Sequence, residues 1–383
     1  MPNTAKWVWL SEAFYKGSSR AKELVMRFRK IEALFQAGEA EIKRALPTVT
    51  QNELSALLSK DLYAAEEIIK KCRQKEIRII TPESKEYPKR LKNIANPPMV
   101  LYARGLPLSL DEEAAVALIG TRKATKIGER AAKKLGREVA AAGGTVVSGL
   151  ARGIDSFSAE GALSAGGKVV AVFGCGVDVP YPRENKKLIE KVCATGTLIS
   201  EFPPGTQPEK INFPIRNRIM SGISLGTAVI EAPEKSGALI TARYAVEQDR
   251  DVFAVPSDIF NENGAGTNAL IREGAIPVMS GFDIVSEYES LFPDRLKTGD
   301  ELLPEENVQK EERDFEFPAG FLDKFSPDER QILAAISASE LYADEIFSKS
   351  GMRAEKALSL ITLLEIRGVI KKLPGNKFKI KDV

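Results

Sequence analysis

The sequence predicts an α/β protein: a doubly wound, mostly parallel sheet, preceded by an all-helical domain and followed by a winged helix. Two observations predict the sheet in the central part of the chain. Between residues 76 and 280, short apolar segments alternate with stretches long enough for amphipathic helices. The apolar segments are continuous, which is typical of strands buried on both faces of a parallel sheet. The right-handed crossover rule then gives a doubly wound, Rossmann-like sheet that binds ligands beyond the carboxyl ends of its strands.

Residues 1–75 are expected to form the helical domain, because apolar residues recur there at three- and four-residue spacing. The two periodic runs cover residues 24–35 and 54–69, and Pro47 separates them. The segment carries 14 basic and 9 acidic side chains, a net charge of +5. Its cations either line a solvated helix face or add a supplementary nucleic-acid contact; those that interleave with the first run are Arg20, Arg27, Arg29 and Lys30.

The domain from 76 to 286 is expected to contain the sheet. Amphipathic stretches such as Gly128–Ala142 and Ile240–Gln248 separate its strands and provide the crossover helices. The expected strands are Ile77–Thr81, Val100–Ala103, Val116–Gly120, Thr145–Ser148, Val169–Gly174, Thr197–Ser200, Ala228–Glu231, Val252–Val255 and Ile276–Met279.

Residues 287–317 have the composition of a linker, with 11 acidic and 4 basic side chains and little apolar periodicity. Residues 318–383 then predict a winged helix-turn-helix. Ser326-Pro327-Asp328-Glu329 is a capping box with proline at the first helical position. Three helices are expected at 327–338, 343–349 and 353–367, followed by a hairpin about Pro374-Gly375-Asn376.

The composition argues against catalysis and against a metal site. The chain has no histidine, which removes the usual general base, the common zinc ligand and the Ser-His-Asp and Cys-His hydrolases. Its three cysteines, Cys72, Cys175 and Cys193, are odd in number and scattered, which is typical of a chain from the reducing cytosol. No apolar run has membrane-spanning length and no secretory leader is visible. We therefore expect a cytoplasmic, non-enzymatic protein without cofactor, metal or membrane contact.

Three glycine-rich turns follow successive strands and predict anion binding at one sheet edge. They are Gly120-Thr121-Arg122, the run from Ser148-Gly149 to Arg152-Gly153, and Gly174-Cys175-Gly176. Glycine lets backbone N–H groups approach a phosphate, and a helix N-terminus adds partial positive charge. The third turn lacks the last glycine of a dinucleotide fingerprint, so no nicotinamide cofactor is expected.

The densest chemical signal is the segment 210–218, placed just before a helix. It combines cations for phosphates with a ring for base stacking, which is how single-stranded nucleic acid is held. The alternative is that Phe213 packs in the core and the arginines bridge carboxylates. Arg183, Lys186 and Lys187 form a second basic cluster near the same edge. The candidate contacts in the segment are Lys210, Phe213, Arg216, Asn217 and Arg218.

From Val116 to Ile284 the sequence closely resembles the DNA-processing protein A (DprA, or Smf) family. The matching motifs come in order along the chain, so the resemblance is specific. The flanking helical domain and winged helix also resemble optional parts of that family. The motifs are Gly120-Thr121-Arg122, Ser148 to Asp155, Tyr181-Pro182 with Asn185, Ser200-Glu201, Phe213 to Ile219, Glu231-Ala232, Ser236 to Ala242, and Gly266-Thr267-Asn268 with Leu270-Ile271.

The resemblance implies binding of single-stranded DNA, formation of a homodimer, and delivery of the RecA recombinase onto incoming strands during natural transformation, with no catalysed reaction. By position it implies DNA contacts at Arg122, Arg183, Lys210, Phe213, Arg216 and Arg218. Apolar residues Val246, Leu270 and Ile271 are candidates for the dimer interface. Two departures from the family are Ala159, where a histidine is usual, and a helical domain that keeps only Gly17 of a Gly-Ile-Gly hairpin.

Two other functions remain open at this point. Gly226-Thr227 with Glu231 resembles the motif of nucleoside-monophosphate hydrolases, although a Glu at a strand end more often pairs with an arginine, here Arg216 or Arg218. The winged helix also raises the possibility of a sequence-specific transcription factor. Its third helix is rich in apolar residues and is expected to be buried over most of its surface, leaving few side chains to read base edges.

Overall fold

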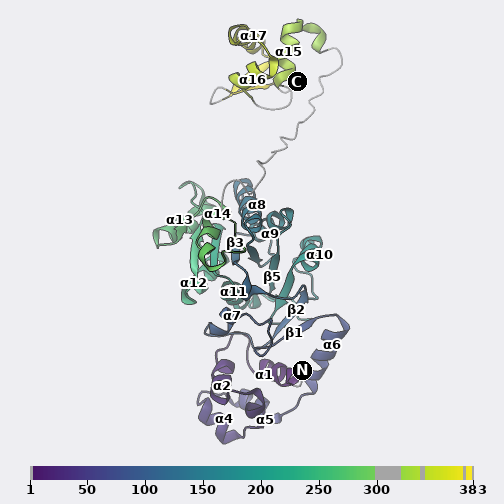
Figure 1. Cartoon of the computed structure of the whole chain (residues 1–383), viewed down its shortest axis with the longest axis vertical. Coiled ribbons are helices and arrows are strands. Elements are labelled where there is room, and N and C mark those ends of the chain that lie inside the picture. The colour runs from purple at the N-terminus through teal and green to yellow at the C-terminus, as the bar shows by residue number, and fades with distance from the viewer. Residues whose placement is uncertain (1–2, 298–320, 337–340, 374–376, 382–383) are drawn as a thin grey trace. The chain divides into compact units, whose positions relative to one another are not determined.

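The computed structural model describes residues 3–297, 321–336, 341–373 and 377–381. The chain divides into two compact units, Met1–Leu302 and Leu303–Val383. Figure 1 shows the larger unit with its helical N-terminal region and central sheet, and the smaller unit that contains α15 to α17.

The larger unit is organised by a nine-stranded sheet in the order β1-β2-β6-β5-β4-β3-β7-β8-β9. From β6 to β9 all neighbours are parallel, and only the pairs β1–β2 and β2–β6 are antiparallel. The mostly parallel sheet is thus confirmed. The strands are β1 (Arg78–Ile80), β2 (Leu101–Gly105), β3 (Ala115–Gly120), β4 (Thr145–Ser148), β5 (Val169–Phe173), β6 (Thr197–Ser200), β7 (Gly226–Glu231), β8 (Asp251–Ala254) and β9 (Ile276–Pro277).

Helices cover both faces of this sheet. Successive strand residues point to opposite sides, so each face has its own apolar cluster. On β3, Val116 and Leu118 join one apolar cluster and Ala117 and Ile119 join the other. Residues of α8 (Lys126–Ala141), α9 (Ile154–Ser164), α10 (Lys186–Thr195) and α14 (Gly281–Ser286) belong to the first cluster. Residues of α7 (Lys89–Asn93), α11 (Asn212–Ile223), α12 (Gly237–Glu247) and α13 (Ala265–Arg272) belong to the second or pack against it.

The N-terminal helices share the first apolar cluster with the sheet and therefore pack directly against it. The periodic apolar residues expected there, including Leu24, Leu34 and Leu57, are buried. Polar contacts fix the junction: Asn96 Nδ2 donates to the Gly17 carbonyl at 2.9 Å, and Lys75 pairs with Asp178. The helices are α1 (Thr4–Ala13), α2 (Arg20–Phe28), α3 (Ile31–Gln36), α4 (Glu39–Ala45), α5 (Gln51–Ser59) and α6 (Tyr63–Gln74).

The start of the acidic segment belongs to the folded core, so the linker boundary expected at 287 is wrong. Tyr288 is buried and its hydroxyl donates to Asp251 Oδ2 at 2.8 Å. Leu296 is only 5% exposed, and the Lys297 amide donates to the Ala142 carbonyl at 3.0 Å. Apolar anchors within an acidic stretch are enough to hold it against the sheet. The rest of the expected linker, 298–317, lies outside the described residues.

The smaller unit has the expected winged-helix elements around its own apolar core. The capping box is confirmed, since the Glu329 amide donates to Ser326 Oγ at 3.3 Å and the Ser326 amide donates to Glu329 Oε2 at 2.8 Å. The turn at 374–376 lies outside the described residues. The elements are α15 (Pro327–Ile336), β10 (Leu341–Tyr342), α16 (Ala343–Ser350), α17 (Ala354–Ile366), β11 (Ile370–Leu373) and β12 (Lys377–Ile380).

Candidate nucleic-acid interface

The sheet order creates a crevice beside β3, whose parallel neighbours are β4 on one side and β7 on the other. The chain leaves β3 toward β4 and returns to β7 only after β6, so the loops after β3 and β7 diverge at the carboxyl edge. Ligands of doubly wound sheets bind at such a switch point.

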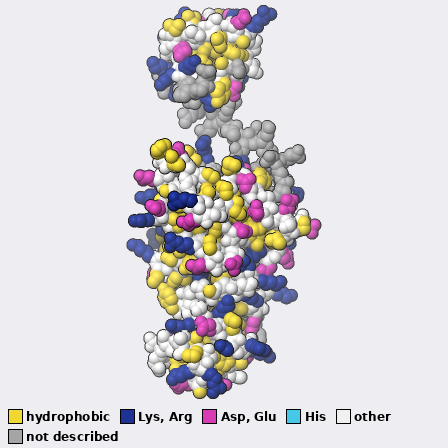
Figure 2. Space-filling view, turned by 90° about the vertical axis from the view of Figure 1, so that its left-hand side faces the viewer, with side chains coloured by type: hydrophobic (Ala, Val, Ile, Leu, Met, Phe, Trp, Pro, Cys, Tyr) yellow, Lys and Arg dark blue, Asp and Glu magenta, His cyan; other side chains and the backbone are white. Residues whose placement is uncertain are grey.

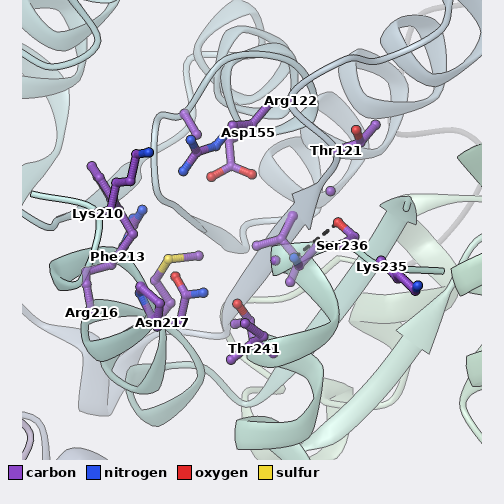
Figure 3. A pocket seen from close by; sticks show the side chains of 18 of the residues that line it. Thr121, Arg122, Asp155, Lys210, Phe213, Arg216, Asn217, Lys235, Ser236 and Thr241 are labelled. Carbon is purple, nitrogen blue, oxygen red and sulfur yellow. Dashed lines mark hydrogen bonds between the residues drawn. The ribbon is translucent and has the colours of Figure 1, made fainter. Parts of the chain in front are cut away.

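A cavity of about 540 Å³ occupies this crevice. Figure 3 shows its wall, with side chains of α11 on the left and the start of α12 on the right. The expected contacts that line it are Gly120, Thr121, Arg122, Lys210, Phe213, Arg216 and Asn217.

Arg122, Phe213 and Tyr181 form a cluster of planar groups in the cavity wall. The Arg122 guanidinium carbon lies 5.4 Å from the centroid of the Phe213 ring, and the Tyr181 ring centroid lies 5.4 Å from the same ring. Gly174 makes room for this ring, since a Cβ there would lie 3.0 Å from Phe213 Cδ1. Phe213 is half-buried and remains accessible from the cavity, so the cluster offers both a cation and a stacking surface.

The exposed cations of the cavity are free to meet a ligand. Arg122, Lys210 and Lys235 are exposed, and no carboxylate in the described ranges forms an ion pair with any of them. Exposed, unpaired cations around a cavity create a local positive potential that attracts polyanions.

Arg216 and Asp155 form the floor of the cavity. The Arg216 guanidinium lies against Gly149, where a Cβ would come within 2.2 Å of its Nη1, and it donates to the Val172 carbonyl. Burial lowers the pKa of Arg216 to about 10. Burial also raises the pKa of Asp155, although the charge of Arg216 opposes that shift, and Asp155 accepts the Gly149 amide at 3.0 Å. This pair therefore sets the shape of the loop after β4 as well as the charge of the floor.

Arg218 does not reach the cavity, and its expected DNA contact is wrong. Its side chain is 1% exposed and pairs with Glu201 at 2.9 Å, itself 5% exposed. It also donates to the Asn96 carbonyl at 2.9 Å. The segment was expected just before a helix, whereas α11 already begins at Asn212. Helical spacing turns Phe213, Asn217 and Met220 toward the cavity and Arg218 toward the N-terminal helices.

Glu231 pairs with neither arginine, contrary to the expected Arg216 or Arg218 partner. Its carboxylate accepts the Thr125 amide at 2.9 Å and the Thr125 hydroxyl at 2.7 Å, at the N-terminus of α8. The residue is 4% exposed, and a Cβ at Gly128 would lie 2.2 Å from Glu231 Oε2. Glu231 is thus enclosed in the cap of a helix, where its charge is stabilised.

The other expected contacts surround the cavity at different depths. Gly149 and Arg152 line a smaller adjoining cavity of about 50 Å³. Arg152 is exposed and paired with Glu184. Ser148 is fully buried and Gly176 is enclosed by the Asp178 side chain and backbone, so both act within the loops. Arg183 and Lys186 are exposed after β5, outside both cavities.

The loop after β7 also lines the cavity, although none of its residues is among the expected contacts. Lys235, Ser236 and Thr241 line the cavity opposite α11, and Ser236 caps α12 by accepting the Ala238 amide at 3.3 Å. The rule that ligands bind where the strand order reverses predicts a contribution from this loop, because it applies to the loops after both β3 and β7. The expected contacts come only from the glycine-rich turns, the segment 210–218 and the basic cluster at 183–187.

Of the expected dimer residues, Val246 lies on α12, and Leu270 and Ile271 lie on α13. Val246 is 65% exposed, whereas Leu270 and Ile271 are half-buried. The loop after β8 carries Ile259 and Phe260, 84% and 89% exposed, and the segment after β9 carries Met279, 80% exposed. Strand β9 is an edge of the sheet with both residues exposed.

No helix within the described ranges combines the length and apolarity needed to cross a bilayer.

Fold and site together define a doubly wound, Rossmann-like protein whose switch-point cavity is lined by free cations and aromatic rings. The chain belongs to the DNA-processing protein A family, DprA or Smf. The family model for DNA recombination-mediator protein A matches residues 78–289, and that for the DprA winged helix domain matches residues 322–376.

Relatives of known name agree with this assignment. The chain is 38% identical over 269 residues to the DNA processing protein DprA of Bacillus subtilis, covering 69% of this chain and 86% of that protein. The crystal structure of Streptococcus pneumoniae DprA superposes with a TM-score of 0.65 and 31% identity, over 73% of this chain and 95% of that one. The structure describing the single-stranded DNA binding mode of Helicobacter pylori DprA superposes with a TM-score of 0.50 and 30% identity, over 57% and 97%.

Proposed function

We propose that this protein binds single-stranded DNA in the switch-point cavity. The observation that carries the proposal is the Arg122–Phe213 pair, which sets a cation for phosphate beside a ring for a base, with Lys210 and Lys235 unpaired around it. The single-stranded DNA binding described for the Helicobacter pylori relative supports it. The contacts we assign are Gly120, Thr121, Arg122, Gly149, Arg152, Lys210, Phe213, Arg216 and Asn217, with Arg183 and Lys186 beside them and Ser148, Gly174 and Gly176 shaping the loops.

The proposal extends to the later steps of DNA processing. The bound strand is protected and passed to the RecA recombinase in the cytoplasm during natural transformation, and the protein acts as a homodimer. The exposed apolar residues from Val246 to Met279, next to an open sheet edge, support pairing of two copies. RecA delivery is measured as faster RecA filament assembly, read by its ATPase, on strands preincubated with the protein.

No reaction is assigned to the site. The one carboxylate that resembles a hydrolase residue, Glu231, caps α8 and is enclosed by Gly128. Incubation with nucleoside monophosphates should therefore release no free base, and release that Glu231→Gln abolishes would overturn this part.

Preference for single strands is the direct test of the main proposal. A stacking ring needs an unpaired base face, while the bases of a duplex are already stacked. Gel-shift titrations of one sequence in single- and double-stranded form, at the same salt concentration, should show tighter binding of the single strand. Equal affinity for the two forms, or tighter binding of the duplex, contradicts the proposal, because binding through phosphates alone requires no unpaired base.

A further inference from the structure

Helix α17 carries an apolar face that no described residue of its own unit covers. The expectation that this helix is mostly buried is wrong: only Ala357, Ile361 and Leu364 are buried. Leu358 is 51%, Leu363 39% and Ile366 78% exposed. Figure 2 shows hydrophobic side chains at the surface of this unit. Several exposed apolar residues on one helix of a small unit indicate an interaction site.

The charges around this face do not fit duplex DNA. Lys356 pairs with Asp328 at 2.6 Å and Arg367 pairs with Glu329 at 2.8 Å, so acidic residues of α15 neutralise cations near both ends of α17. The other exposed charged residues of α17 are Glu355 and Glu365, and the helix offers no further cation. A helix in the major groove needs cations for phosphates and polar side chains for base edges. The face is therefore better matched to an apolar protein surface.

We propose that α17 pairs with α17 of a second copy of this chain, in antiparallel orientation. Leu358, Thr362 and Ile366 are spaced by four residues and form one ridge of the helix. A two-fold axis at Thr362 sets Leu358 against Ile366 of the second copy, so the ridge is complementary to itself.

Two further features favour the same arrangement. The axis also brings Leu363 close to its own counterpart, which covers the remaining exposed leucine. Glu355 lies in the first turn of α17 and Arg367 follows its last residue. Arg367 is already paired with Glu329, but parallel pairing sets Glu355 against Glu355 of the second copy, and antiparallel pairing avoids this repulsion.

The size of the face limits the strength of this contact. A stable interface between proteins buries about 1,200–2,000 Å², which is more than a few side chains on one helix provide. The pairing is therefore weak alone and gains from the high effective concentration of copies that are already associated. The gain in effective concentration rests on the proposed homodimer, whereas the pairing itself requires no DNA binding.

Disulfide cross-linking of the full chain tests the pairing. Cys193→Ser leaves only the buried native thiols Cys72 and Cys175. In that background Thr362→Cys places two thiols beside the proposed axis, within reach of a disulfide. Lys371→Cys, at an exposed position on β11, is the matched control. Under mild oxidation we expect linked dimer from Thr362→Cys to form about tenfold faster than from Lys371→Cys, because proximity raises the effective thiol concentration.

Two additional variants decide the interpretation. Leu363→Cys should also cross-link faster than the control, which guards against a local defect at Thr362. Adding Leu358→Asp should remove the excess cross-linking while circular dichroism shows a folded chain. Equal rates for both reporters and the control, or excess cross-linking that survives Leu358→Asp, would overturn the proposal and leave the face to another partner. Since no DNA is present, this failure is distinct from failure of the proposed DNA binding.

Discussion

The guanidinium of Arg122 lies over the ring of Phe213, with 5.4 Å between the guanidinium carbon and the ring centroid. Arg122 lies in the loop after β3, and Phe213 lies in the first turn of α11. Their contact joins a cation, which we propose binds phosphate, to a ring, which we propose stacks a base, and the first two predictions separate these contributions.

Phe213→Ala should weaken binding of single-stranded DNA by about 1–3 kcal/mol, the cost of losing one stacked base. Phe213 is half-buried and lines the cavity, so the fold should tolerate the change. Fluorescence anisotropy with a labelled oligonucleotide measures affinity, and urea unfolding measures stability. Tyr63→Ala, at a 71% exposed aromatic residue on α6, is the control. If the variant loses binding only because it unfolds, Phe213 is a packing residue.

Arg122→Ala should weaken binding of all sequences about equally and reduce the salt slope by roughly one phosphate contact. Arg122 is exposed and unpaired, so its loss removes charge without leaving a buried partner. The slope comes from affinities measured over a range of salt concentrations. Arg130→Ala, another exposed arginine, on α8, controls for net charge. A slope unchanged from that of the parent protein removes Arg122 from the site.

Arg218→Ala should act on stability, lowering the free energy of unfolding by about 3–5 kcal/mol, because it leaves Glu201 charged and unpaired in the interior. The pair is almost fully buried, at 1% and 5% exposure. Chemical denaturation measures the change, and Arg104→Ala, at an exposed arginine of β2, should be near neutral. A fully stable Arg218→Ala variant with reduced DNA affinity would return Arg218 to the binding surface.

Ile271→Glu should convert the proposed homodimer to monomer at micromolar concentration, because it places a charge in an apolar contact. Sedimentation velocity of both proteins reads the outcome directly. Met26→Glu, at a 67% exposed apolar residue on α2, is the matched control and should remain dimeric. A parent protein that sediments only as monomer, or an Ile271→Glu variant that stays dimeric, contradicts the assignment of Val246, Leu270 and Ile271.

A chain ending at Lys297 should fold and bind single-stranded DNA within about an order of magnitude of the full chain, roughly 1.4 kcal/mol. It keeps the whole sheet and the cavity, since Leu296 and Lys297 still contact the core. A chain ending at Pro293 is the comparison and should be less stable by about 1.5–3 kcal/mol, the value of one buried leucine. Thermal unfolding and anisotropy measure both quantities. If the longer fragment folds but does not bind, the main site belongs to the winged helix.

The sequence by itself determined the sheet and the edge at which the candidate site lies. Continuous apolar strands separated by amphipathic stretches allow only a buried parallel sheet, and β3, β4 and β5 each end in a glycine-rich turn at the same edge. Arg122 follows from that placement, because the carboxyl ends of parallel strands meet at one edge. Lys210 and Phe213 follow from the combination of cations and an aromatic ring in the segment 210–218.

Only the tertiary structure decided which side chains point into the cavity. Arg216 and Arg218 are two residues apart, yet one forms the cavity floor and the other is buried with Glu201 on the opposite side of α11. Lys235 enters the site because β7 lies beside β3 in space, far from it in sequence. The apolar positions of α17 are divided between core and surface in the same way. Periodicity gives the spacing of side chains on a helix, but the direction of each face is set by what the helix packs against.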